Sequence, residues 1–175
     1  MFLKVIDRII PVLSVRAMSR RRYFEEVIEP LFRELEPVVE DYFAFFSKSL
    51  ELVRDADRSE ISAIVSQVRE MRDKQFLART KVRELARVLH ESSKDRIVIN
   101  FGRCVCALFE AAPHRPDLRK MSKSVKLIEL FELVEYNYVG RAELVRALKD
   151  SKDEVSIQWI AIVQSYGHLR LRSVV

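Results

Sequence analysis

Three histidines and two cysteines are the residues whose types could support metal binding, redox chemistry or proton transfer. His90, His114 and His168 are scattered, and no carboxylate stands beside them at the spacing of a zinc-binding helix. Cys104 and Cys106 are two positions apart in an apolar run, which is neither a redox nor a zinc-ligand spacing. The sequence also has no glycine-rich phosphate loop and no nucleophile turn. We therefore expect no catalytic site, no metal and no cofactor.

One enzymatic alternative stays open, and it depends on an arginine and a histidine. Six residues separate Arg83 from His90, and this spacing resembles that of a helical ribonuclease family, the higher eukaryotes and prokaryotes nucleotide-binding type. The polar residue that usually follows the arginine is Glu84 here. Because such a spacing arises readily by chance in an arginine-rich helical chain, we favour a protein that is not an enzyme.

The composition predicts a single all-α domain. The chain has 175 residues, 49% of them apolar, which is enough to bury one core without disulfides or metals. Only three glycines and five prolines interrupt a sequence rich in strong helix formers. The two cysteines have no disulfide-framework or metal-binding spacing, which indicates an intracellular protein. No apolar stretch is long enough to span a membrane.

The net charge of +5 is confined to the first residues of the chain. Residues 1–22 contain six basic residues and one acidic residue, whereas the remaining residues contain 25 of each. A basic and apolar segment of this kind predicts contact with anionic membrane surfaces through residues 1–22. A nucleic-acid partner is not expected, because the rest of the chain carries no basic excess.

Apolar residues recur every three or four positions through most of the chain, which is the pattern of amphipathic helices. The predicted helices cover residues 38–53, 59–77, 82–89, 117–139, 141–149 and 155–169. Pro37 is expected to restart the helix, since proline tolerates the first helical position. The expected organisation is therefore a basic amphipathic extension, residues 1–36, followed by a helical domain, residues 37–175.

A nearly continuous apolar run, residues 97–109, is expected to lie at the centre of the bundle. Beyond Arg103 it has no polar side until Glu110, and a helix that is apolar all round must be surrounded by other helices. Cys104 to Phe109 should be its most buried part. Lys123, by contrast, is expected at the surface.

The start of this run carries a recognisable motif. Asn100-Phe101-Gly102-Arg103 is similar to the first homology motif of the B-cell-lymphoma-two (Bcl) family of apoptosis regulators, which reads Asn-Trp-Gly-Arg. A glycine lets a second helix approach the backbone closely, and the arginine beside it offers a planar set of donors to a carboxylate. On these grounds we expect Arg103 to pair with an aspartate of a partner helix, and Gly102 to make room for that helix.

Further matches follow in the family's order. Val38-Val39-Glu-Asp-Tyr-Phe resembles the family's first helix, and Leu85-Ala-Arg-Val88-Leu89 the helix before the first motif. The third homology motif, the death motif, is similar to Val68-Arg-Glu-Met71-Arg72-Asp73, with Arg72 in place of a glycine. The second motif is similar to Trp159-Ile-Ala-Ile-Val-Gln-Ser-Tyr166-Gly167, without the usual glycine pair.

The resemblance implies a Bcl-like helical bundle, in which amphipathic helices wrap a central apolar hairpin from Phe101 to Val139. It also implies a surface groove that binds the amphipathic death-motif helix of pro-apoptotic partners. The groove residues would be Arg103, Gly102, Asn100, Val105, Leu85, Val88, Leu89, Phe76 and Tyr166. The chain's own death-motif-like segment would present Val68, Met71 and Asp73.

The biological role implied is regulation of apoptosis, in the cytosol and at the surface of the mitochondrial outer membrane. Arg72 degrades the chain's own death motif, which favours a pro-survival protein over a pro-apoptotic effector. The resemblance also leaves open a homo- or heterodimer.

Overall fold

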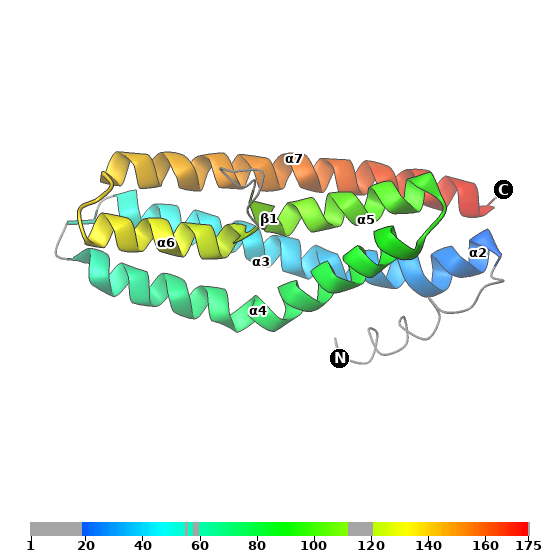
Figure 1. Cartoon of the computed structure of the whole chain (residues 1–175), viewed down its shortest axis with the longest axis horizontal. Helices are drawn as coiled ribbons and strands as arrows, with labels where there is room; N and C mark the ends of the chain where they lie inside the picture. Colours follow the sequence, from blue (N-terminus) through cyan, green and yellow to red (C-terminus); the bar gives the residue numbers. More distant parts are fainter. Residues whose placement is uncertain (1–18, 55, 58–59, 112–120, 175) are drawn as a thin grey trace. The chain divides into compact units, whose positions relative to one another are not determined.

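The computed structural model describes residues 19–54, 56–57, 60–111 and 121–174, and over these residues the protein is an all-α helical bundle (Figure 1). The expected fold class is confirmed at this level. Six α-helices and one π-helical turn are present in the described residues: α2 Arg20–Tyr23, η1 Phe24–Ile28, α3 Glu29–Arg54, α4 Ile61–Ser92, α5 Arg96–Phe109, α6 Lys123–Glu135 and α7 Arg141–Val174. The strands β1 Glu110–Ala111 and β2 Met121–Ser122 form a short antiparallel pair.

The chain forms two compact units, and three helices contribute to both. Of the described residues, the first unit contains 19–39, 78–108 and 158–174, and the second contains 40–54, 56–57, 60–77, 109–111 and 121–157. Each unit therefore takes one segment of α3, one of α4 and one of α7, together with α5 in the first unit or α6 in the second.

The helical segment that begins at Arg20 continues to Arg54, so the expected restart at Pro37 is wrong. The hydroxyl of Ser19 accepts a hydrogen bond from the Arg22 N–H at 3.3 Å and caps the start. Pro30 has no N–H and would crowd the carbonyl of Glu26 in an α-helix. The wider π turn directly before Pro30 accommodates the missing hydrogen bond. Residues 1–18 of the expected extension lie outside the described residues.

Two other helix boundaries also differ from the expectation. Residues 82–89 are not a separate helix but belong to α4, and α7 is one helix where a break had been expected between residues 149 and 155. Neither interval contains glycine or proline, and polar residues alone do not end a helix. The two helices of the expected central hairpin, α5 and α6, belong to different units.

The core of the first unit is aliphatic, with an aromatic cluster on one side. Its buried residues include Val27, Ile28, Leu31, Leu35, Val82, Leu85, Ala86, Leu89, Val98, Phe101, Val105, Leu108, Ile162 and Leu169. Phe32 of α3 stacks on Trp159 and Tyr166 of α7, with ring centroids 5.4 and 3.9 Å apart. The α5 helix is not surrounded on all sides, however, because Arg96, Asn100 and Arg103 are exposed along one face.

Buried aromatic rings dominate one end of α3 in the second unit. Tyr42 packs edge-on against Phe46 and Phe109, with centroids 5.1 and 5.7 Å apart. Phe131, Leu144, Leu148 and Val155 are also fully buried in this unit.

Lys123, expected at the surface, is only 4% exposed. Its ammonium group donates to the Glu110 carbonyl at 2.9 Å and lies 3.5 Å from the Glu154 carboxylate. The expectation is wrong because the short strand pair brings the carbonyl of β1 next to the first residue of α6.

Candidate functional site

The residues expected to line a partner-binding groove do not all reach the surface. Leu85, Leu89 and Val105 are buried in the core of the first unit. Apolar side chains that are packed against one another in this way cannot also receive the anchors of an incoming helix. An open groove at these three residues would require α4 and α5 to separate.

Gly102 is a point of close contact between α5 and α4. A Cβ atom at this position would lie 2.7 Å from the Ala86 carbonyl oxygen and 2.9 Å from the His90 Cβ. The sequence motif therefore predicted a close helix contact correctly, but the helix that makes this contact is the chain's own α4. In this structure Gly102 faces α4, and its role toward a partner helix stays a prediction.

Five of the expected groove residues are accessible to different degrees. Val88, Asn100 and Arg103 are exposed in the first unit, whereas the exposed Phe76 belongs to the second unit. Tyr166 is half-buried between Phe24 and Phe32 of the N-terminal helical segment. Burial raises the pKa of the Tyr166 phenol, and the Glu29 carboxylate adds to this effect.

The chain's own death-motif-like segment lies in α4. Val68 is buried in the second unit and Met71 is half-buried. Asp73 is exposed, and its carboxylate accepts two hydrogen bonds from Arg72, at 2.6 and 2.8 Å. This segment contributes its first apolar residue to the core and does not present it to solvent.

The ribonuclease alternative depends on two residues that also lie in α4. Arg83 forms an ion pair with Glu84 at 3.4 Å, and its carbonyl accepts a hydrogen bond from the Cys106 thiol at 3.7 Å. His90 is half-buried beside Gly102.

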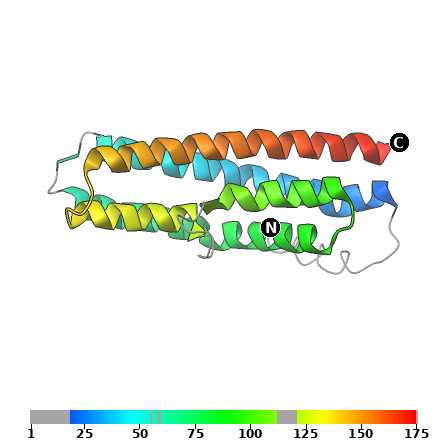
Figure 2. The same ribbon diagram turned by 45° about the horizontal axis from the view of Figure 1, so that its top comes forward.

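Helices α5 and α7 are antiparallel neighbours in the first unit, and they lie side by side in both views (Figures 1 and 2). The Asn100 amide donates to the Ser165 hydroxyl at 3.5 Å, and the Arg172 guanidinium donates to both Asp95 oxygens, at 3.1 and 3.2 Å. As the chain advances along α5, the residue opposite on α7 lies earlier in the sequence.

Several exposed residues of these two helices lie outside the sequence predictions, which named only Arg103 among them. Arg96 and Arg103 are exposed on α5, and His168 and Arg170 are exposed on α7. The exposed apolar residues of α7 in this unit are Ile160, Val163, Leu171 and Val174. The signal that could have revealed them is the absence of any carboxylate from residues 96–108 and 158–174.

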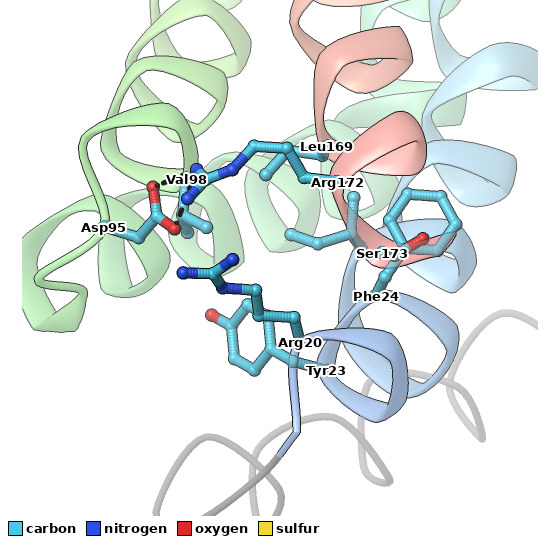
Figure 3. A pocket seen from close by; sticks show the side chains of 9 residues that line it. Arg20, Tyr23, Phe24, Asp95, Val98, Leu169, Arg172 and Ser173 are labelled. Carbon is cyan, nitrogen blue, oxygen red and sulfur yellow. Dashed lines mark hydrogen bonds and ion pairs between the residues drawn. The ribbon is translucent and has the colours of Figure 1, made fainter. Parts of the chain in front are cut away.

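A small pocket lies at the end of α7, beside the start of α5 (Figure 3). Its volume is about 40 Å³, and Arg20, Tyr23, Phe24, Ile28, Asp95, Val98, Leu169, Arg172 and Ser173 line it. Ligand pockets are roughly ten times larger, so this one has room for little more than a water molecule. Burial, with a smaller contribution from the Asp95 charge, raises the pKa of Tyr23 to about 12.

Asp95 has two partners at this point. Besides the ion pair with Arg172, one carboxylate oxygen accepts a hydrogen bond from the Ile97 N–H at 2.8 Å, which caps α5. Asp95, which lines the pocket, therefore connects the end of α7 to the start of α5.

Within the described part of the chain, no group of three or more histidine, cysteine, aspartate or glutamate residues is placed to hold a metal ion. Over the same residues, no helix combines the length and the apolar character needed to cross a membrane. No family model matches the sequence, and neither the curated proteins nor the solved structures contain a match.

Proposed function

We propose that this protein is a non-enzymatic regulator of apoptosis that binds the amphipathic death-motif helix of a pro-apoptotic partner. The resemblance to the Bcl family supplies the biological role. The single observation that carries the binding mode is the position of Arg103, which is exposed on a face of α5 without any carboxylate. A guanidinium in this position can form a paired, bidentate contact with an aspartate of an incoming helix.

A pro-survival role is favoured over that of an effector. An effector must present its own death motif to another molecule, but Val68 is in the core and Asp73 is engaged by the adjacent Arg72. The chain is therefore better suited to receive a helix than to donate one. We place this activity in the cytosol and at the surface of the mitochondrial outer membrane, with residues 1–22 as the proposed membrane contact.

Titration of a panel of synthetic death-motif peptides against the full chain, followed by fluorescence anisotropy, tests the proposal. Removing one partner of a desolvated charge pair costs about 2 to 5 kcal/mol, so Arg103→Ala should weaken binding by at least about tenfold. The matched control is Arg146→Ala, which removes an exposed arginine from the second unit and should leave binding unchanged.

A double-mutant cycle identifies the partner of Arg103. If Arg103 pairs with the aspartate of the peptide, changing that aspartate to alanine should have little further effect in the Arg103→Ala protein. The proposal is wrong if no death-motif peptide binds. The assignment of Arg103 is wrong if the two changes weaken binding additively.

A further inference from the structure

Three stretches that are far apart in the sequence meet at one end of the first unit. Arg20 and Tyr23 of α2, Asp95 at the start of α5 and Arg172 of α7 line the same small pocket (Figure 3). The Arg172 guanidinium joins α7 to α5 directly, because it donates to both Asp95 oxygens, at 3.1 and 3.2 Å. The start of α2, the start of α5 and the end of α7 are therefore neighbours.

This end of the unit carries an excess of positive charge. We define the basic end as residues 19–26, 91–97 and 168–174. Together these stretches contain seven lysine or arginine residues and four aspartate or glutamate residues, an excess of three positive charges. In the sequence, the residues that precede Ser19 add a further basic excess.

The four acidic residues of the basic end are all paired with arginines. Glu25, Glu26 and Asp95 lie 2.8, 2.6 and 3.1 Å from Arg21, Arg22 and Arg172, respectively, and Glu91 lies 3.6 Å from Arg87. These pairs leave four exposed cations, and none of the four forms an ion pair with any residue that the structure describes: Arg20, Lys94, Arg96 and Arg170.

The last turn of α7 places apolar side chains beside these cations. Leu171 is 70% exposed and Val174 is 82% exposed. The two residues are three positions apart and so lie on the same side of the helix, and Arg170 is four positions from Val174. Exposed aliphatic tips next to arginines are the combination found where proteins contact the headgroup region of a membrane.

The positive excess does not extend along the middle of α7. Tyr166 lies one turn before Arg170, and there the Glu29 and Glu36 carboxylates of α3 raise the pKa of the phenol while Arg170 and Arg33 lower it. Charges of both signs therefore surround this part of the helix. The exposed Ile160, earlier still in α7, lies outside the basic end and serves as a control.

We infer that the basic end binds an anionic lipid surface. Leu171 and Val174 enter the headgroup region, and the four unpaired cations face the negative charges of the lipids. The inference rests on the proposed function in one respect, that residues 1–22 contact a membrane. It adds that the start of α5 and the end of α7 form part of the same contact.

The shape of the basic end favours a lipid surface over a protein ligand. The pocket there, about 40 Å³, has no room for the apolar anchor of a partner helix. A membrane surface needs no recess, because protruding cations and aliphatic tips are enough for binding. A nucleic acid would use the cations but would leave Leu171 and Val174 in water.

Co-sedimentation of the full chain with vesicles tests the inference. Mixed phosphatidylserine and phosphatidylcholine vesicles should bind the protein at least about tenfold more strongly than pure phosphatidylcholine vesicles, and added salt should weaken the binding. Arg96→Gln and Arg170→Gln should each reduce the partition coefficient about fivefold. Leu171→Gln should reduce it several-fold.

Two variants are matched controls for these changes. Arg146→Gln removes an exposed arginine from the second unit, and Ile160→Gln removes an exposed apolar side chain from the same helix as Leu171. Neither should change vesicle binding. All the substituted side chains are exposed, so the variants should keep the fold of the wild type, which circular dichroism checks.

Several outcomes would overturn the inference. These are equal binding to the two kinds of vesicle, no binding to either, and a loss with Ile160→Gln as large as that with Leu171→Gln. The inference also fails if vesicles do not bind while duplex DNA binds in a manner that depends on Arg96 and Arg170.

Failure of the inference can be told apart from failure of the proposed function. If Arg20→Gln weakens vesicle binding but Arg96→Gln, Arg170→Gln and Leu171→Gln do not, the membrane contact is confined to residues 1–22 and the inference fails alone. If the vesicle results are as expected while no death-motif peptide binds, the apoptotic function fails alone.

Discussion

Gly102 and Ala86 are in contact through their backbones, since a Cβ atom on Gly102 would lie 2.7 Å from the Ala86 carbonyl oxygen. A backbone atom in a helix cannot rotate away as a side chain can. The distance between α4 and α5 in the first unit is therefore set by the lack of a side chain at Gly102.

The Gly102→Ala protein should be less stable than the wild type by about 1 to 3 kcal/mol, because the two helices must move apart. Gly102→Leu should prevent the first unit from folding, so it is unsuitable for testing binding. Urea unfolding followed by circular dichroism measures the difference. An unchanged midpoint for Gly102→Ala would show that the contact is not this close.

Gly167→Ala is the matched control in the same unit. No described heavy atom lies within 4 Å of the added Cβ, and the residue is inside α7. Replacing a helix-interior glycine with alanine should stabilise the protein by about 0.5 to 1 kcal/mol. The two substitutions should thus shift the urea midpoint in opposite directions.

Substitutions of Asp95 can distinguish the two roles of its carboxylate, which caps the start of α5 and forms an ion pair with Arg172. Asp95→Asn keeps a good capping side chain but loses the ion pair with Arg172, a partly exposed pair worth roughly 0.5 kcal/mol. Asp95→Ala loses both, and the cap adds about 1 kcal/mol. Arg172→Ala should match Asp95→Asn in thermal unfolding; if Asp95→Asn is instead as unstable as Asp95→Ala, the capping role is wrong.

Lys123→Ala should destabilise the protein by about 1 to 3 kcal/mol, because it removes a buried side chain together with the hydrogen bond that its ammonium group donates to the Glu110 carbonyl. Lys123→Met fills the same space and should cost less than Lys123→Ala. Lys149→Ala changes an exposed lysine and should have little effect. Equal unfolding midpoints for Lys123→Ala and Lys149→Ala would contradict the buried position of Lys123 and agree with the surface position that the sequence predicted.

Tyr23 should make stability depend on pH in the alkaline range. Its pKa in the folded protein is raised to about 12 from an ordinary value of 10, chiefly by burial. Between these values the phenol ionises in the unfolded chain but not in the folded one, so the free energy of unfolding falls as pH rises. The stabilisation is complete below pH 10 and is lost as pH passes the folded pKa.

Comparison with Tyr23→Phe isolates this effect from other groups that titrate in the same range. Phenylalanine keeps the ring in place but cannot ionise, so the variant should lose less stability than the wild type as the pH is raised. Urea midpoints at a series of pH values provide the measurement. Parallel curves for the two proteins would contradict the raised pKa.

The sequence predicted the helical class and the presence of a close contact at Gly102, because both depend on local spacing. It did not predict which helix makes that contact, since a glycine permits approach from any neighbour. Lys123 was misplaced because its burial depends on the Glu110 carbonyl and the Glu154 carboxylate, which the fold brings to it. The continuous α7 was not predicted, because the polar residues 150–154 resemble a linker between two helices in the sequence.

The exposed apolar residues of α7 were missed for a different reason. Ile160 and Leu171 look like ordinary core residues in the sequence, and only the direction of α7 shows that they point outward. Arg103 was singled out from its motif, whereas Arg96 and Arg170 belong to no motif in the sequence.

The π turn at residues 24–28 holds one residue more than an α-helical turn of the same span. Deleting one residue there, such as Glu25, would yield a regular α-helix in which Leu31 and Leu35 keep their direction toward the core. Pro30 would then crowd the preceding turn. A deletion within α3 itself would rotate one flank of the helix by about 100° relative to the other and expose part of the core. A change in chain length should therefore disturb the core less at the π turn than elsewhere in the helix, provided that Pro30 is replaced as well.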